Sequence, residues 1–463
     1  MKKLLIGFLA VGLIMSFAMT ASAQPNIKAS GSYYAYGTYV DNQALTKDRD
    51  SRANVAQRLR MQFEIQVQEG LKLTTRFDAM ERVWGQNPTV PTTNVIASGY
   101  QYDRTEQNIS WERAYVTFNA LYGVFDVGYQ QTIQWGTCAF CNDYTSDAAV
   151  KYQYMMGPWT FGLSWEKVTG YIGTGANPLT AISEGSKAQG STSLQGTDDD
   201  RDMYTAFAIY RWATGQAGLR YMFERDATNG ITVTTTAPYG YSTAPGVEWT
   251  YSFHEIAPYL QWVAGPFALE AEFRYVWGKT DYDGDGTTPD VDRKGWDLYL
   301  NGKYTMGAFY GGLEFAYITG DDPNTSDKNE AGVPGGDGWD PLLMFGNNLF
   351  HKWHGAMGTS VATVNSIEKN LIMVKPYVGW KVNPQLEVVA QFAWLKADEK
   401  PTASRDDDYG REFNIYANYK LYNNLTYTVG FGYFWTGDYF QSATGTVNLE
   451  DNYLLMHQLT LSF

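Results

Sequence analysis

Hydrophobic and polar residues alternate along many short segments of this chain. In 266–278 every second residue is apolar, and the residues between are mostly small or charged; 425–435 repeats the pattern. The last segment alternates as well and ends on an aromatic residue, Phe463. A repeat of two places successive side chains on opposite faces of an extended chain. The pattern therefore predicts β-strands with one apolar and one polar face.

Turn residues and polar stretches separate these segments in a regular way. Eight tight turns are expected near 69–70, 120–123, 157–158, 215–216, 265–266, 307, 383–384 and 423–424. Nine longer polar loops are expected at 41–52, 85–108, 132–147, 170–200, 227–249, 280–294, 320–370, 398–410 and 438–452. Such an arrangement joins 18 strands, or 16 if the hairpin around 201–226 is misread. Short turns on one side and long loops on the other are typical of transmembrane barrels.

Composition agrees with strands that face lipid. Beyond residue 23 no run of 18 apolar residues occurs, so no helical span is expected. Aromatic residues make up 16% of the chain, and the mean hydropathy is −0.36. A barrel that is apolar outside and wet inside combines moderate hydropathy with aromatic girdles. A soluble sandwich also alternates, but its loops would not divide into two length classes. The predicted fold class is all-β, a transmembrane antiparallel up-and-down barrel.

The first 23 residues have the organisation of a secretory signal. Lys2 and Lys3 precede an apolar run, and Ala21-Ser22-Ala23 forms a small-x-small cleavage pattern. We expect cleavage after Ala23, which leaves 24–463 as a single barrel domain. The formal net charge of −14 becomes more negative when the two lysines are lost.

Together the alternating strands, the two loop classes and the terminal Phe463 make the mature chain resemble the bacterial outer-membrane porins. In that family the final Phe is the signal read by the barrel-assembly machinery. The resemblance implies a water-filled channel for passive diffusion of ions and small hydrophilic solutes. It also implies a homotrimer in contact with lipid and lipopolysaccharide, with one extracellular loop folded into each lumen. No nucleic-acid partner and no required cofactor are expected.

Basic residues gather on the polar faces of three neighbouring strands. Alternation in 53–68, 71–82 and 110–120 places these side chains opposite the apolar rows: Arg58, Arg60, Arg76, Arg82 and Arg113. All except Arg82 resemble the arginine ladder that porins present on one wall of the pore. Charges in a low-dielectric wall filter ions efficiently. The alternative is that these guanidinium groups pair with nearby carboxylates and only solvate the wall.

The loop at 132–147 is the third by count, the position that constricts the lumen in porins. By that resemblance Asp143 and Asp147 are candidates for the acidic side of the constriction. The longer loops 170–200 and 320–370 are alternatives for this role. Cys138 and Cys141 lie in the same loop of an exported protein, which favours a disulfide over a metal or redox role.

An acidic loop at 280–294 has the spacing of a calcium site. Carboxylates stand at positions 1, 3, 5 and 12 of the loop, with Gly286 at position 6: Asp281, Asp283, Asp285 and Asp292. Asp in place of Glu at position 12, Pro289 within the loop and flanking strands depart from the EF-hand pattern. A solvated acidic turn is the alternative.

No enzyme motif accompanies these features. Two other functions stay open at this point. The barrel could sheathe or anchor a partner protein such as an electron-transfer cytochrome. It could also act as an outer-membrane lipid hydrolase, which requires a Ser and a His on adjacent strands; His457 is the one histidine assigned to a strand of this kind.

Overall fold

The fold is seen in a computed structural model, which describes most of the chain outside the N-terminal segment and several loops. The described residues are 25–47, 51–85, 109–137, 139–140, 146–169, 201–227, 248–283, 289–333, 335–336, 338–365, 369–400 and 405–463. The expected signal segment 1–23 lies outside them. Among the described residues, no helix is long and apolar enough to cross a membrane.

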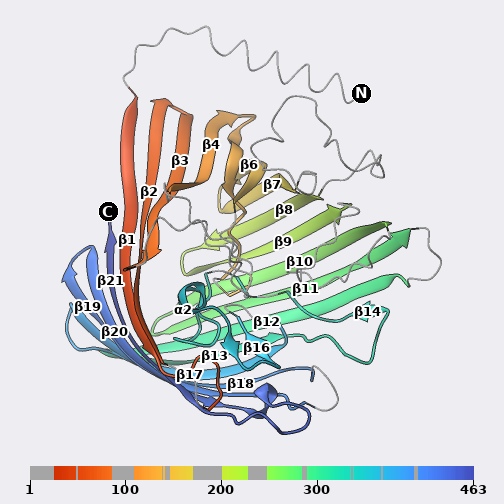
Figure 1. The fold of residues 1–463 in the computed structure, drawn as a ribbon. Helices are drawn as coiled ribbons and strands as arrows, with labels where there is room; N and C mark the ends of the chain where they lie inside the picture. The colour runs from red at the N-terminus through yellow and green to blue at the C-terminus, as the bar shows by residue number, and fades with distance from the viewer. Residues whose placement is uncertain are drawn as a thin grey trace.

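Eighteen antiparallel strands form a closed barrel (Figure 1). Each strand pairs with its neighbours along the chain, and β1 pairs with β21 to close the ring, with Ser32 opposite Ser462. The expectation of 18 strands is confirmed. Their bounds are β1 Asn26–Val40, β2 Arg52–Gln68, β3 Leu71–Val83, β4 Ile109–Ala120, β5 Gly123–Gln131, β6 Ser146–Met156, β7 Trp159–Thr169, β8 Arg201–Trp212, β9 Gly215–Asp226, β10 Glu248–Ala264, β11 Phe267–Asp283, β12 Val291–Met306, β13 Phe309–Ile318, β17 Leu371–Lys381, β18 Leu386–Lys396, β19 Asp408–Tyr422, β20 Leu425–Thr436 and β21 Asn452–Ser462.

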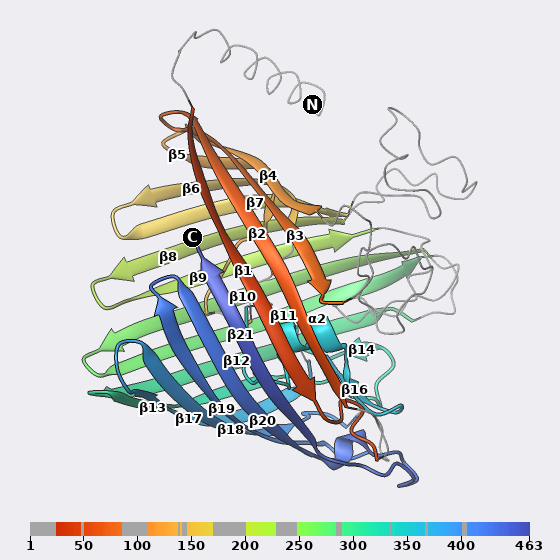
Figure 2. The same cartoon turned by 60° about the vertical axis from the view of Figure 1, so that its left-hand side comes forward.

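Connections alternate between tight turns at one end of the barrel and longer segments at the other (Figure 2). Most turns lie where the sequence places them. The turn between β8 and β9 is at 213–214, two residues earlier than expected. Strands β11 and β12 extend to Asp283 and from Val291, so the predicted loop 280–294 is largely paired strand. A long paired hairpin satisfies more backbone hydrogen bonds than a loop does.

The two faces of the wall differ as the alternation predicts. On β11, Phe267 and Phe273 face outward with 57% and 36% exposure, while Glu272 and Arg274 are buried inside at 1% and 2%. Outward aromatic residues form two belts. Trp159 and Tyr210 contact each other at a tilted angle near the turns, and His254 and Trp277 stack near the loops. Aromatic belts of this kind mark the two membrane interfaces.

Two loops fill part of the interior. The segment that follows β5 and the long segment 319–370 between β13 and β17 both pack against inward-facing side chains. The longer one carries the helix α2 (Asn348–His354) and the short strands β14 (Lys328–Asn329), β15 (Met357–Gly358) and β16 (Thr363–Val364). Asn347 caps α2 by accepting from the backbone N–H of Phe350 at 2.7 Å. The buried core of the protein therefore lies between these loops and the barrel wall.

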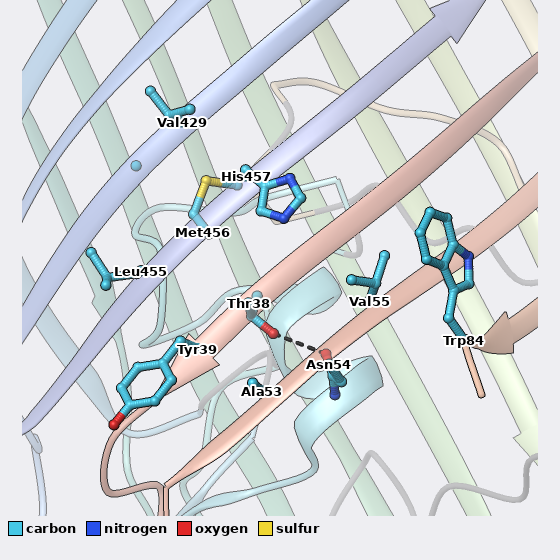
Figure 3. Close-up of a pocket in the computed structure, with 11 residues that line it drawn as sticks. Thr38, Tyr39, Ala53, Asn54, Val55, Trp84, Val429, Leu455, Met456 and His457 are labelled. Carbon is cyan, nitrogen blue, oxygen red and sulfur yellow. Dashed lines mark hydrogen bonds between the residues drawn. The ribbon is translucent and has the colours of Figure 1, made fainter. Parts of the chain in front are cut away.

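A depression of about 640 Å³ marks the outer surface near the seam where β1 meets β21 (Figure 3). Gly37 of β1 stands opposite both Val55 and His457, and the ring of His457 lies over the place that a side chain at Gly37 would take. An added Cβ at Gly37 would lie 2.1 Å from His457 Nε2. Phe463 completes the seam through backbone hydrogen bonds with Gly31 of 2.8 and 3.0 Å.

Candidate functional site

An arginine-rich wall occupies the inner face of β2, β3 and β4. Arg58 and Arg60 lie on β2, Arg76 on β3 and Arg113 on β4. Arg76 and Arg113 stand directly opposite each other in the β3–β4 register. The structure thus brings together four of the five arginines expected from the sequence. Because like charges at directly opposed positions repel, these guanidinium groups require nearby carboxylates.

At the centre of this wall, two carboxylates form ion pairs with the arginines. Arg60 Nε donates to Asp78 Oδ1 at 2.7 Å, and Arg60 Nη2 donates to Glu112 Oε1 at 2.7 Å. Arg76 Nε lies 2.6 Å from Glu112 Oε2. Charge-assisted pairs of this kind are short and fix the guanidinium plane. The arginines are therefore held in place, as the alternative interpretation of the wall expected for some of them.

Glu81 links the wall to the interior loop. Arg58 Nη1 lies 3.5 Å from Asp78 and 3.8 Å from Glu81, and Lys352 of α2 forms an ion pair with Glu81. The side chains of Arg58 and Arg60 keep 21% and 22% of their exposure inside the barrel. These guanidinium groups are therefore paired and still reach the water of the lumen.

Two β-bulges decide which charges face inward. In β3, Met80 and Glu81 together oppose the single residue Arg58, and Met80 adopts a φ of 54°. Beyond this bulge Arg82 pairs with Gln57, which lies on the outward row of β2. Strict alternation placed Arg82 in the lumen, and that placement is wrong because a bulge shifts the facing of every later residue. The second bulge turns Glu112 toward the arginines.

The loop after β5 docks on the side of the barrel far from β2. Trp135 Nε1 donates to the carbonyl oxygen of Ala257 at 2.9 Å. Thr137 donates through its backbone N–H at 2.8 Å and its hydroxyl at 2.6 Å to Glu272 Oε2. Asp147 is not part of this loop, because β6 already begins at Ser146. Cys138, Cys141 and Asp143 lie outside the described residues.

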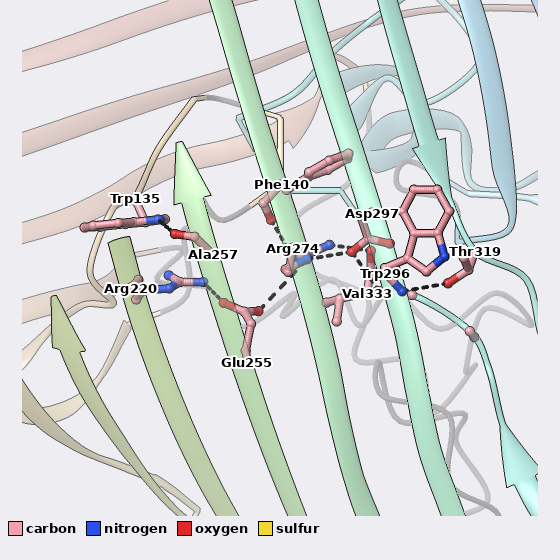
Figure 4. A network of polar contacts seen from close by, with 12 residues as sticks. Trp135, Phe140, Arg220, Glu255, Ala257, Arg274, Trp296, Asp297, Thr319 and Val333 are labelled. Carbon is pink, nitrogen blue, oxygen red and sulfur yellow. Dashed lines mark hydrogen bonds and ion pairs between the residues drawn. The ribbon is translucent and has the colours of Figure 1, made fainter. Parts of the chain in front are cut away.

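A row of buried charges on β9 to β12 supports this docking (Figure 4). Arg220 pairs with Glu255, and Arg274 Nε donates to Asp297 Oδ2 at 2.6 Å. Arg274 also donates to the carbonyl oxygens of Phe140 at 2.9 Å and Val333 at 2.5 Å. One guanidinium group therefore binds the wall and both interior loops. The loops also join directly where the N–H of residue 336 donates to the carbonyl oxygen of residue 139 at 2.7 Å.

Glu412 of β19 anchors the longer loop farther round the barrel. Its fully buried carboxylate accepts the backbone N–H groups of residues 343–345 at 2.8 to 3.1 Å. Lys375 Nζ donates to the carbonyl oxygen of Pro341 at 2.8 Å. The inward position of Glu412 follows from strand alternation, but its partners lie about 70 residues away in the sequence. Sequence reasoning therefore missed this contact.

Helix α2 is held against β1 by its histidine and tryptophan side chains. His354 Nε2 lies 2.8 Å from Thr38 Oγ1, and Trp353 Nε1 donates to the hydroxyl of Tyr34 at 3.2 Å. His351 Nδ1 lies 2.9 Å from the carbonyl oxygen of Gly355. Burial lowers the pKa of both His351 and His354 to about 4. Both imidazoles are therefore neutral at physiological pH.

In the acidic hairpin between β11 and β12, a lysine side chain pairs with the carboxylates. Lys279 Nζ lies 2.5 Å from Asp281 and 2.8 Å from Asp290. Asp292 stands opposite Lys279 in the β11–β12 register. Asp285 and the side chain of Asp283 lie outside the described part. Among the described residues, no group of three or more metal-ligating side chains gathers at one point.

Comparison with known proteins decides the family. A family model for Gram-negative porins matches residues 10–336. The chain belongs to the Gram-negative porin family. A search of curated proteins finds no match.

Solved structures of outer-membrane channels are similar to this chain at low sequence identity. A BenF-like porin from Pseudomonas fluorescens Pf-5 is 12% identical, with a TM-score of 0.50 over 95% of this chain and 99% of that one. OccK9 of Pseudomonas aeruginosa is 13% identical, with a TM-score of 0.49 over 94% and 99%. The channel DcaP of Acinetobacter baumannii is 14% identical, with a TM-score of 0.42 over 96% and 99%.

Family and fold together indicate where this porin lies in the cell and what it does. It lies in the bacterial outer membrane and forms a channel for passive diffusion of small solutes. Its interior is divided between a wall covered by docked loops and the arginine-rich wall, whose charged side chains remain partly exposed.

Proposed function

We propose that this porin prefers small anionic solutes, such as carboxylates and phosphate. The observation that carries the proposal is the charge balance of the exposed wall. Four guanidinium groups, Arg58, Arg60, Arg76 and Arg113, share it with the three carboxylates Asp78, Glu81 and Glu112. Lys352 of α2 adds a further positive charge at its edge. Planar guanidinium donors suit the oxygens of carboxylates and phosphates.

The acidic exterior opposes this preference only weakly. The whole chain carries a formal charge of −14, which attracts cations toward the protein. Exposed charges are screened over about 8 Å at physiological ionic strength. Charges in a narrow, low-dielectric passage are screened much less. The wall that every solute must pass therefore determines the sign of the selectivity.

We also propose that the channel works by diffusion alone and catalyses no reaction. The ring of His457 lies over Gly37 on the outer face, and no serine hydroxyl hydrogen-bonds to it among the described contacts. Among the described residues there is thus no Ser–His pair of the kind that a lipid hydrolase requires. Loops of the chain itself occupy part of the interior, which leaves little room for a sheathed partner protein.

We further propose that the porin is a homotrimer, as its family membership leads us to expect. Native mass spectrometry of protein extracted in mild detergent tests the subunit number directly. A species of three chains supports the proposal, and a species of one chain opposes it.

The test of anion preference is the double substitution Arg58→Gln/Arg60→Gln. It leaves two guanidinium groups against three carboxylates, so the reversal potential in a salt gradient should move toward cation preference. The matched control is Arg411→Gln, which removes one positive charge from the outward row of β19. A reversal potential equal in wild type, the double variant and the control would remove the arginine-rich wall from the account.

A further inference from the structure

Two tyrosine side chains lie on the inner wall of the barrel near its tight turns. Tyr310 of β13 shares its row with Glu314, which accepts from Trp339 of the longer loop at 3.0 Å. Tyr377 of β17 shares its row with Lys375, which donates to the same loop. Alternate residues of a strand lie on one face. Both tyrosines therefore face the interior, and they are called the tyrosine pair below.

Each member of the tyrosine pair reaches across a neighbouring strand to the strand beyond it. The hydroxyl of Tyr310 donates to Glu387 Oε1 on β18 at 3.1 Å, and β17 lies between β13 and β18. In the opposite direction, the hydroxyl of Tyr377 donates to Asn301 Oδ1 on β12 at 2.9 Å, and β13 lies between those strands. Neighbouring strands are about 4.8 Å apart. A side chain that spans two such spacings runs along the wall.

Glycine residues make room for both rings. Gly379 stands opposite Tyr310, and Gly312 stands opposite Tyr377. A Cβ added at Gly379 would lie 2.0 Å from Tyr310 Cζ, and one added at Gly312 would lie 2.5 Å from Tyr377 Cζ. The ring centroids are 6.4 Å apart and the ring planes are inclined at 64°, so the two rings form the sides of a corner. Both side chains are half-buried, so part of each ring meets the lumen.

Polar groups border the tyrosine pair. Asn418 of β19 donates to Glu387 Oε2 at 3.5 Å and accepts from the hydroxyl of Thr428 at 2.8 Å. Lys303 of β12 is exposed, and its ammonium lies 5.9 Å from the centre of the Tyr310 ring. The charges of Lys303 and Glu387 are opposite. This part of the wall therefore offers hydrogen-bond donors and acceptors without the excess positive charge of the arginine-rich wall.

The tyrosine pair also lies apart from the other sites of the interior. Strands β12 and β13 are halfway round the ring from β3 and β4, which carry part of the arginine-rich wall. The longer loop docks on Lys375, which is two residues farther from the turn end of β17 than Tyr377. The tyrosine pair is therefore placed between that loop and the turn end of the barrel.

We propose that the tyrosine pair and its polar border bind the hydroxylated ring of a sugar. The C–H face of a pyranose ring is apolar and packs on aromatic carbon, while each hydroxyl at its edge both donates and accepts. Aromatic side chains with a few directed polar groups are a common lining of small-molecule sites. A free phosphate would instead be repelled by Glu387. The proposal does not depend on the anion preference, because the site lies on another wall and needs no charge on the solute.

The first test compares glucose with sorbitol, an open-chain polyol of nearly the same size. Each is added at equal concentrations to the wild-type porin in a planar bilayer while the conductance is recorded. Both slow ions through viscosity, but only glucose carries a rigid apolar face. We expect glucose to lower the conductance further than sorbitol does, and this extra fall should saturate. Equal effects of the two probes would overturn the sugar site, whereas the reversal potential in a salt gradient would still judge the anion preference separately.

Three variants assign the effect to the tyrosine pair. Tyr310→Leu/Tyr377→Leu removes both rings, so the extra fall with glucose should weaken at least several-fold. Tyr310→Phe/Tyr377→Phe keeps the rings and should retain most of it. The matched control is Tyr304→Leu on the outward row of β12, where the tyrosine is 44% exposed. An undiminished effect in the leucine double variant, or its loss in the phenylalanine variant, would overturn a site built on ring contact.

A further variant covers the case in which the leucine double variant fails to fold, which the heat-induced mobility shift on gels reveals. Glu387→Leu removes the acceptor at the edge of the site and leaves both rings in the chain. Its extra conductance fall with glucose should also weaken at least several-fold. An unchanged fall in this variant would count against the polar border as the group that holds the sugar hydroxyls.

Discussion

Single carboxylates decide how the interior of this porin is organised. Glu412 receives three backbone N–H groups from one loop, and Glu272 receives the backbone and hydroxyl donors of Thr137 from the other. Hydrogen bonds to a charged acceptor contribute about 1.5 to 3 kcal/mol each. These two residues therefore fix the loops more effectively than apolar contact alone.

We predict that Glu412→Gln loosens the longer loop. The amide offers one uncharged oxygen in place of a carboxylate that binds three donors, so docking should weaken by about 2 to 4 kcal/mol. Single-channel recordings should show a higher or noisier open current than wild type. The control is Glu450→Gln, an exposed residue between β20 and β21. Identical current traces for all three proteins would show that Glu412 does not hold the loop.

Arg274 is predicted to be critical for stability. Its removal in Arg274→Met leaves Asp297 and the carbonyl oxygens of two loops without their shared donor. Breaking a buried pair by removing one partner costs about 3 to 5 kcal/mol. The heat-induced mobility shift on gels should occur at a lower temperature. The double variant Arg274→Met/Asp297→Leu should recover part of the loss, and no recovery would argue against the pair as the cause.

At the scale of elements, α2 makes the longer loop sensitive to acid. Burial lowers the pKa of His351 and His354 from 6.5 to about 4, so the released loop binds protons more readily than the docked one. Docking is therefore at full strength above pH 6.5 and weakens as the pH falls toward 4.

This sign gives a measurable prediction. Amide exchange of residues 351 and 355, whose N–H groups donate to the carbonyl oxygens of residues 347 and 351, should be faster at pH 4.5 than at pH 7, after correction for intrinsic exchange rates. In His351→Gln/His354→Gln the difference should largely disappear, because neither position titrates. A difference of equal size in the double variant would assign the acid response to other groups.

The strands, and the face of the sheet on which each side chain lies, were largely predictable, because apolar and polar residues alternate along each strand. Arg58, Arg60, Arg76 and Arg113 reach the interior for that reason. Arg82 does not, because a bulge depends on the register with β2 and leaves no mark in the alternation of β3. The docking of residues 343–345 on Glu412 was equally hidden, since it joins segments distant in sequence.

On the scale of the whole molecule, the 18-strand closure followed from counting turns and loops, whereas the division of the interior did not. The loop after β5 and most of the longer loop pack on other strands, α2 reaches β3 through the Lys352–Glu81 ion pair, and Arg58 and Arg60 keep part of their exposure. The sequence offered the third loop and, as alternatives, the loops 170–200 and 320–370 for folding into the lumen, and both the segment after β5 and 320–370 pack inside. Asp147, however, belongs to the wall and not to the constricting loop.

The most direct test of the account is the reversal potential of the wild-type porin in a planar bilayer with a tenfold gradient of potassium chloride. Excess guanidinium charge along the passage predicts a reversal potential of the sign for chloride preference, with conductance reduced when phosphate is added. A reversal potential of the opposite sign, unaffected by phosphate, would contradict the assignment of the arginine-rich wall as the selective element.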